Sequence, residues 1–154
     1  MKELLFMRKL ALILFLFSAS ITSLSAQINS KEIDWKFLSK VDFVDKYYEE
    51  YEAWYLFPEF SDPIKKLDGK KVKIKGYVIP LDVEDNLYAL SAYPFSSCFF
   101  CGGAGPESVM SLKFKGKPRH FDTDDVATFE GTLHLNTTDL DTFNYVLQNA
   151  EEVK

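Results

Sequence analysis

The chain has 154 residues and a formal net charge of -5 at pH 7, and 47% of its residues are hydrophobic. This length suits a single domain, since domains average about 100 to 200 residues, and the apolar content is ample for a core. The negative charge argues against nucleic acid or an anionic membrane surface as a partner, because both repel an acidic protein.

Residues 1–26 have the composition of a secretory signal peptide. A positively charged start precedes an apolar run over residues 10–17, which is shorter than the roughly 20 residues that a membrane span needs. Small residues follow, and they predict cleavage near Ala26. An uncleaved anchor is the alternative. We therefore expect a periplasmic or secreted protein with no stable membrane insertion after cleavage.

Residues 27–66 are predicted to form an aromatic-rich amino-terminal extension that packs on the following domain. Trp35 and Leu38 fit a short helix, and residues 41–44 alternate as a strand does. Three later rings at helical spacing indicate another helical face: Tyr47, Tyr51 and Trp54. A short capped helix is expected around Pro63. We interpret the rings as cover for a hydrophobic edge, with a stacking platform for a ligand as the alternative.

Residues 67–154 change to a period of two, which is typical of strands. Five strands are predicted over residues 70–79, 87–93, 108–114, 126–135 and 143–152. Gly76 indicates a bulge or sharp bend in the first strand, and Pro80 is predicted to end that strand. Asn149 indicates a bulge in the last strand. This pattern predicts a mainly β fold, a small five-stranded Greek-key barrel of the oligonucleotide/oligosaccharide-binding (OB) type, with an open sandwich as the alternative.

Both cysteines lie in the loop between the second and third predicted strands, as Cys98-Phe99-Phe100-Cys101-Gly102-Gly103. Two thiolates at this spacing supply half of a tetrahedral shell, and the glycine pair after them resembles the knuckle of zinc ribbons. The sequence therefore predicts a soft metal ion, zinc or copper, at this loop. The predicted ligands are Cys98 and Cys101, completed by His120, His134 or Glu107.

Three other interpretations of this loop stay open. A structural disulfide, or two buried thiols, would fix a glycine-rich loop in an oxidising compartment. A thiol-disulfide oxidoreductase would use Cys98 as the attacking and Cys101 as the resolving thiol, although no helix follows to stabilise the thiolate. An envelope protein or other ligand would instead contact an aromatic surface made by Phe99, Phe100, Tyr77 and Tyr93.

No nucleophile elbow, phosphate-binding loop or dinucleotide fingerprint is present in the sequence. We therefore expect a non-enzymatic binding module, with a metal ion or an envelope protein as its partner.

The motifs at residues 67–70, 76–80 and 98–107 resemble those of an exported bacterial family known only as a domain of unknown function. The resemblance covers about residues 35–153 and implies a periplasmic, OB-like domain with no established activity. Some relatives carry a Cys-x-His pair where this sequence has Cys98-x-x-Cys101. That exchange keeps metal ligation and removes a disulfide, so the resemblance implies metal binding. Residues 24–27 also resemble the signal-peptide ends common in Bacteroidetes proteins.

Overall fold

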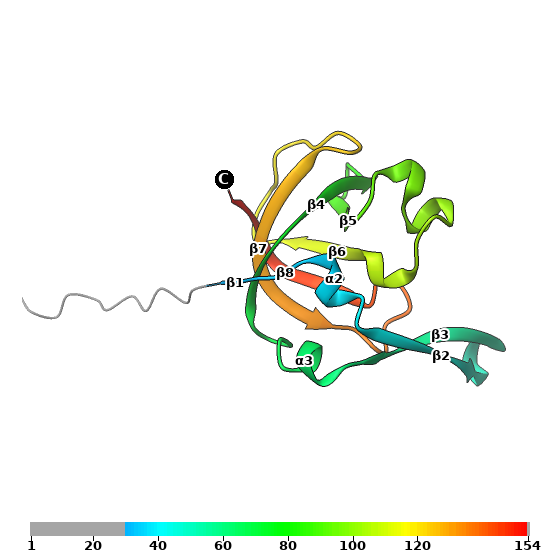
Figure 1. The fold of residues 1–154 in the computed structure, drawn as a ribbon. Coiled ribbons are helices and arrows are strands. Elements are labelled where there is room, and N and C mark those ends of the chain that lie inside the picture. The colour runs from blue at the N-terminus through cyan, green and yellow to red at the C-terminus, as the bar shows by residue number, and fades with distance from the viewer. Residues whose placement is uncertain (1–29, 154) are drawn as a thin grey trace, which may run out of the picture.

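The computed structural model describes residues 30–153, so the predicted signal peptide lies outside the described residues. Five strands form the body of the molecule: β4 (Lys71–Asp82), β5 (Leu87–Ser91), β6 (Val109–Phe114), β7 (Val126–Leu135) and β8 (Tyr145–Val153). They are hydrogen-bonded in the order β4-β5-β6-β8-β7, and β7 pairs again with β4, which closes the sheet (Figure 1). Only the β6–β8 pairing is parallel among these five strands. The predicted small five-stranded barrel of the OB type is confirmed.

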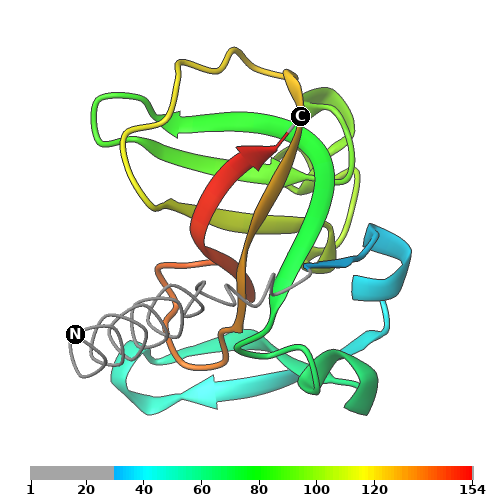
Figure 2. The same cartoon turned by 90° about the vertical axis from the view of Figure 1, so that its left-hand side faces the viewer.

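Strand β4 bends sharply because it belongs to both sides of the barrel (Figure 2). It pairs with β7 up to Tyr77 and with β5 from Tyr77 onward. Gly76 lies at this change of partner, where an added Cβ would be 2.6 Å from the carbonyl oxygen of Ser91. The register with β7 is unbroken at Gly76, so the glycine permits a close backbone approach at a bend, and no bulge forms there.

Pro80 does not end β4 as the sequence predicted. The strand runs to Asp82, and Pro80 pairs with Tyr88. Beyond Tyr77 only β5 pairs with this strand. No second strand therefore depends on a hydrogen bond from the N–H group that Pro80 lacks.

The bulge predicted near Asn149 is confirmed. The pairing of β8 shifts register at this point with both β6 and β7, and Asn149 has a positive φ of 52°. The extra residue returns Ala150 to the inside of the barrel, where it is 2% exposed.

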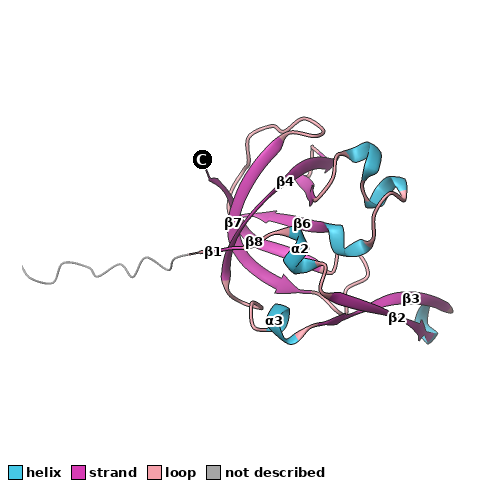
Figure 3. Cartoon of the chain, viewed as in Figure 1, coloured by secondary structure: helices cyan, strands magenta, loops and turns pink. Residues whose placement is uncertain are grey.

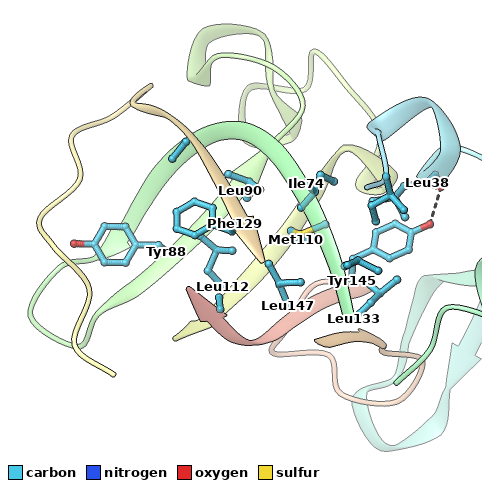
Figure 4. Close-up of a cluster of buried hydrophobic side chains, with 14 of the residues drawn as sticks. Leu38, Ile74, Tyr88, Leu90, Met110, Leu112, Phe129, Leu133, Tyr145 and Leu147 are labelled. Atoms are coloured by element: carbon cyan, nitrogen blue, oxygen red, sulfur yellow. Dashed lines mark hydrogen bonds between the residues drawn. The ribbon is translucent and has the colours of Figure 1, made fainter. Parts of the chain in front are cut away.

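The barrel interior is a continuous apolar core (Figure 4). Because side chains alternate between the two faces of a strand, every second side chain points into the barrel. In β7 these include Ala127, Phe129 and Leu133. Removing each large side chain of this kind from water contributes about 1.5–3 kcal/mol to folding. The core also includes Leu90, Met110, Leu112, Tyr145 and Leu147.

The residues before the barrel form short elements at its side and end. They are β1 (Lys31–Glu32), α2 (Trp35–Leu38), β2 (Val41–Tyr48), η1 (Glu49–Tyr51), β3 (Ala53–Phe60) and α3 (Asp62–Lys65). Asp34 caps α2, since its carboxylate accepts a 2.7 Å hydrogen bond from the amide of Phe37. No helix within residues 30–153 has the length and apolar character that crossing a bilayer requires.

Strands β2 and β3 pair only with each other and stand away from the barrel as a hairpin (Figure 3). We call residues 41–60 the arm. The helical face predicted for Tyr47, Tyr51 and Trp54 is wrong, because Tyr47 and Trp54 face each other across two strands and Tyr51 lies in the turn between them. Aromatic and β-branched residues at alternating positions favour this extended structure.

Candidate functional site

The cysteine loop, residues 92–108, connects β5 to β6. It contains three single turns of 3-10 helix, η2 (Phe95–Ser97), η3 (Phe99–Cys101) and η4 (Pro106–Ser108). Two contacts hold the loop on the barrel. The amide of Ala92 donates to the carbonyl of Ser108 at 2.9 Å, and the carboxylate of Asp124, from the loop between β6 and β7, accepts from the amide of Phe95 at 2.7 Å.

Cys98 is completely buried and belongs to a small apolar cluster beneath this loop. Its neighbours in the cluster are Ile79, Ala89 and Val109, and Phe143 packs against them. The thiol donates a 3.0 Å hydrogen bond to the carbonyl of Phe95. Cys98 therefore acts as a small apolar anchor with its one polar hydrogen satisfied.

Cys101 is exposed at the end of η3, and both cysteines are free thiols. The carbonyl of Cys98 accepts hydrogen bonds from the amides of Cys101 and Gly103, at 3.2 and 3.1 Å. Gly102 has a φ of 71°, and a Cβ on Gly103 would lie 2.6 Å from the carbonyl oxygen of Ser97. The turn therefore requires both glycines. Its amides donate to the backbone carbonyls of Cys98 and Phe99, whereas the zinc-ribbon knuckle that the sequence resembles would turn them toward the sulfurs.

Both predicted histidine ligands have partners of their own. His120 lies 3.3 Å from a carboxylate oxygen of Asp122, and His134 lies 3.6 Å from one of Asp68. Glu107 lies on η4, within the cysteine loop. Residues 30–153 contain no group of three or more His, Cys, Asp or Glu side chains that could hold a metal ion. A metal site at Cys98 and Cys101 stays a prediction, without a described third ligand.

Four phenylalanine rings cover the cysteine loop, and we call them the aromatic cap: Phe95, Phe99, Phe100 and Phe143. Phe143 contacts Phe100 at 5.7 Å and Phe99 at 6.4 Å between ring centroids, and Phe95 stacks on Phe100 at 6.4 Å. The three rings of the loop are 37–43% exposed. The local sequence pattern indicates Phe99 and Phe100 but not Phe143, which comes from the loop between β7 and β8.

Tyr77 and Tyr93 do not join this cap. Tyr77 lies in β4, opposite Ser91 and Val126. Tyr93 is half exposed at the start of the loop, and its amide donates to the hydroxyl of Ser91. Among the ring pairs of the described residues, neither tyrosine contacts a cap ring.

The aspartates beside the loop have structural roles. Arg119 donates to the carboxylate of Asp125 at 3.1 Å and to Glu152 at 2.9 and 3.1 Å. The hydrogen bond from Arg119, followed by one from the amide of Asp122, lowers the pKa of Asp125. This ion pair holds the segment that carries Asp124, which in turn positions Phe95.

The fold and this loop define a small OB-type barrel that presents an aromatic and thiol-bearing loop at its surface. No protein-family model matches the chain, and no curated protein matches it in sequence. The structure is similar to the crystal structure of a DUF3299 family protein from Pseudomonas aeruginosa PAO1, with a TM-score of 0.51 and 16% identity, covering 81% of this chain and 97% of that chain. At this identity the likeness shows the fold alone, and it agrees with the OB-like fold that the resemblance implies.

Proposed function

We propose that this protein is an exported, non-enzymatic binding module whose aromatic cap docks a protein of the bacterial envelope. The observation that carries the proposal is the cap itself, in which Phe95, Phe99 and Phe100 expose more than a third of their surface while their rings contact one another. Grouped apolar surface of this kind marks interaction sites, and aromatic side chains supply a large share of interface binding energy.

The base of the cap supports this function because it is tied to the barrel by packing and hydrogen bonds. Cys98 fixes one end of η3 in its apolar cluster, Phe143 supports Phe99 and Phe100 from below, and Asp124 holds the amide of Phe95. A surface that is ordered before binding loses less conformational entropy when a partner docks.

A second candidate function is the binding of a soft metal ion, and the glycine-dependent turn at Cys98 and Cys101 favours it. Both thiols are free, and thiolates select zinc or copper(I). Ligation requires Cys98 to lose the proton that it now donates to Phe95. Since zinc takes four ligands, the remaining positions would be filled by solvent or by a docked partner.

Docking is tested by replacing Phe100 with a photo-crosslinking amino acid in cells, with Leu87 as the control position. Leu87 is equally exposed and lies at the far end of β5 from the cysteine loop. A protein that crosslinks to position 100 but not to position 87 is purified. It is then titrated against the wild type and against a Phe99→Ala, Phe100→Ala variant. We expect about tenfold or greater weakening in the variant. Unchanged affinity contradicts the docking proposal.

Metal binding is tested separately by dialysing the reduced protein against zinc or copper(I). The second candidate predicts about one ion per chain, loss of binding in Cys101→Ser, and unchanged binding in the Phe99→Ala, Phe100→Ala variant. Reduced protein that stays metal-free contradicts it. A Cys101→Ser variant that traps mixed disulfides with envelope proteins would favour the oxidoreductase alternative instead.

A further inference from the structure

The arm carries an apolar face that the barrel covers only at its base. In the antiparallel register, Val41 and Phe60 lie opposite each other, and so do Asp45 and Leu56. Because residues two apart point to the same side of a strand, these pairs share one face with the Tyr47–Trp54 pair. At the base, Phe60 is buried against Tyr145. Further out, the same face is uncovered.

The uncovered part of this face carries three large exposed apolar side chains, Tyr47, Trp54 and Leu56, beside the exposed carboxylate of Asp45. Tyr47 and Trp54 pair across the strands with their ring centroids 5.4 Å apart, and Trp54 is 68% exposed, more than any other large hydrophobic residue of the described chain. Leu56 continues the face toward the barrel at 57% exposed. A two-stranded hairpin has little stability of its own in water, so a partner on this face would stabilise the arm as well as bind it.

The charge of the arm limits what that partner is. The arm has six carboxylates and one lysine, a net charge of -5, whereas all other described residues together have sixteen carboxylates and thirteen lysine or arginine side chains, a net charge of -3. Three of the carboxylates, Glu49, Glu50 and Glu52, lie in the turn at the tip. Anionic lipid, nucleic acid and a second copy of the same arm would all be repelled.

The barrel adds to the negative field at the tip. The pKa of Tyr51 is raised first by the charge of Glu50 and then by partial removal from water, with smaller contributions from the charges of Asp141 and Asp139. The last two residues come from the loop between β7 and β8. Carboxylates of the arm and of the loop between β7 and β8 therefore both act on the tip of the arm. Each of them favours a positively charged neighbour there.

The opposite face of the arm shows how its rings accept a cation. The ammonium group of Lys46 lies 4.5 Å from the ring centroid of Phe57 and 5.5 Å from that of Tyr48. These are cation–π distances. No described lysine or arginine lies over Tyr47 or Trp54, so the more exposed pair of rings lacks the cation that the other face already has.

We infer that the arm is a second docking element, and that it binds a lysine- or arginine-rich segment of another protein. The apolar stems of those side chains lie on Tyr47, Trp54 and Leu56, and their charged ends reach the rings and the carboxylates of the tip. This surface is distinct from the aromatic cap and does not depend on the cysteine loop.

The inference is tested with a fluorescently labelled peptide of alternating lysine and valine, titrated into the purified protein and followed by anisotropy. A peptide with glutamate in place of lysine is the control. We expect the lysine peptide to bind and the glutamate peptide not to bind. The affinity should fall about tenfold or more between low salt and 1 M salt, where the Debye length is only about 3 Å.

Two variants separate the contributions of the arm. Tyr47→Ala with Trp54→Ala removes the rings, and Glu49→Gln, Glu50→Gln, Glu52→Gln removes charge without touching the apolar face. Each should weaken the lysine peptide about tenfold or more. The Phe99→Ala, Phe100→Ala variant should bind it normally, so failure of the aromatic cap proposal leaves this result unaffected.

Three outcomes overturn the inference. One is equal binding of the lysine and glutamate peptides, and another is unchanged affinity in both arm variants. The third is that the wild type sediments as a dimer and the Tyr47→Ala, Trp54→Ala variant as a monomer. That result would assign the apolar face of the arm to a second copy of this chain. Circular dichroism of the triple glutamine variant confirms that a loss of binding is not a loss of folding.

Discussion

The hydroxyl of Tyr145 donates a 2.7 Å hydrogen bond to the carbonyl oxygen of Leu38, 107 residues away in the sequence (Figure 4). Both residues are fully buried. Burial, and to a lesser extent the charge of Glu107, raises the pKa of Tyr145, so the phenol stays protonated and remains a donor at all ordinary pH values. This bond ties helix α2 to the start of β8, next to Phe60 at the base of the arm.

Replacing Tyr145 with Phe should lower the free energy of unfolding by about 1–2 kcal/mol, because the buried carbonyl of Leu38 loses its partner. Urea unfolding measures this change. Tyr88→Phe is the matched control, since the Tyr88 ring is also buried but its hydroxyl is not among the buried side-chain atoms of residues 30–153 that lack a hydrogen bond, and so its loss leaves no buried carbonyl unpaired as the loss of the Tyr145 hydroxyl does. A similar loss in both variants would contradict a specific role for the Tyr145–Leu38 bond.

Gly76→Ala should destabilise the barrel by about 1–3 kcal/mol, because an added Cβ would lie 2.6 Å from the carbonyl oxygen of Ser91 and 2.8 Å from Cγ of Leu90. Gly116→Ala is the control, since a Cβ there meets no atom within 4 Å. Thermal unfolding should show a lower Tm for the first variant and little change for the second. Equal Tm values would mean that β4 does not need the close approach at its bend.

The two thiols should differ in reactivity when the protein is reduced. Cys101 is exposed and Cys98 is buried, so iodoacetamide should alkylate Cys101 about tenfold or more faster, with Cys98 reacting only through local opening of the loop. Mass spectrometry of the digested protein identifies the alkylated residue. Equal rates at the two sites would contradict the apolar anchoring of Cys98.

Arg119 should make stability depend on pH in the acid range. The hydrogen bond from Arg119 holds the pKa of Asp125 below the ordinary value of an aspartate. A carboxylate with a lowered pKa in the folded state stabilises the fold above its unfolded pKa, and this contribution is lost as pH falls through the folded value. An NMR titration should show the pKa of Asp125 rising in Arg119→Ala. The effect on stability itself should be small because the pair is exposed to solvent.

The strands of the barrel could be predicted where apolar and polar residues alternate, and most clearly in β7, which was predicted with both of its ends correct. The arm was not predicted as a hairpin, because Tyr47, Tyr51 and Trp54 repeat at helical spacing. That spacing arises from two strands and the turn between them. Periodicity alone does not separate these cases when the strands are short and aromatic on both faces.

The candidate site was predicted only where it is local in sequence. Cys98, Phe99, Phe100 and the two glycines form one turn, so their spacing was informative. Phe143 and Asp124 reach the loop through the closure of the barrel, from segments far along the chain. Nothing in the residues around either position indicated these long-range contacts, since they depend on the pairing of β8 with β6 and of β4 with β7.

The most direct test of the account is the affinity of the protein captured at Phe100 for the wild type and for the Phe99→Ala, Phe100→Ala variant, measured by calorimetry with purified components. The cap variant should bind about tenfold or more weakly than the wild type, while Leu87→Ala should bind as the wild type does. Equal affinity for the wild type and the cap variant would contradict it.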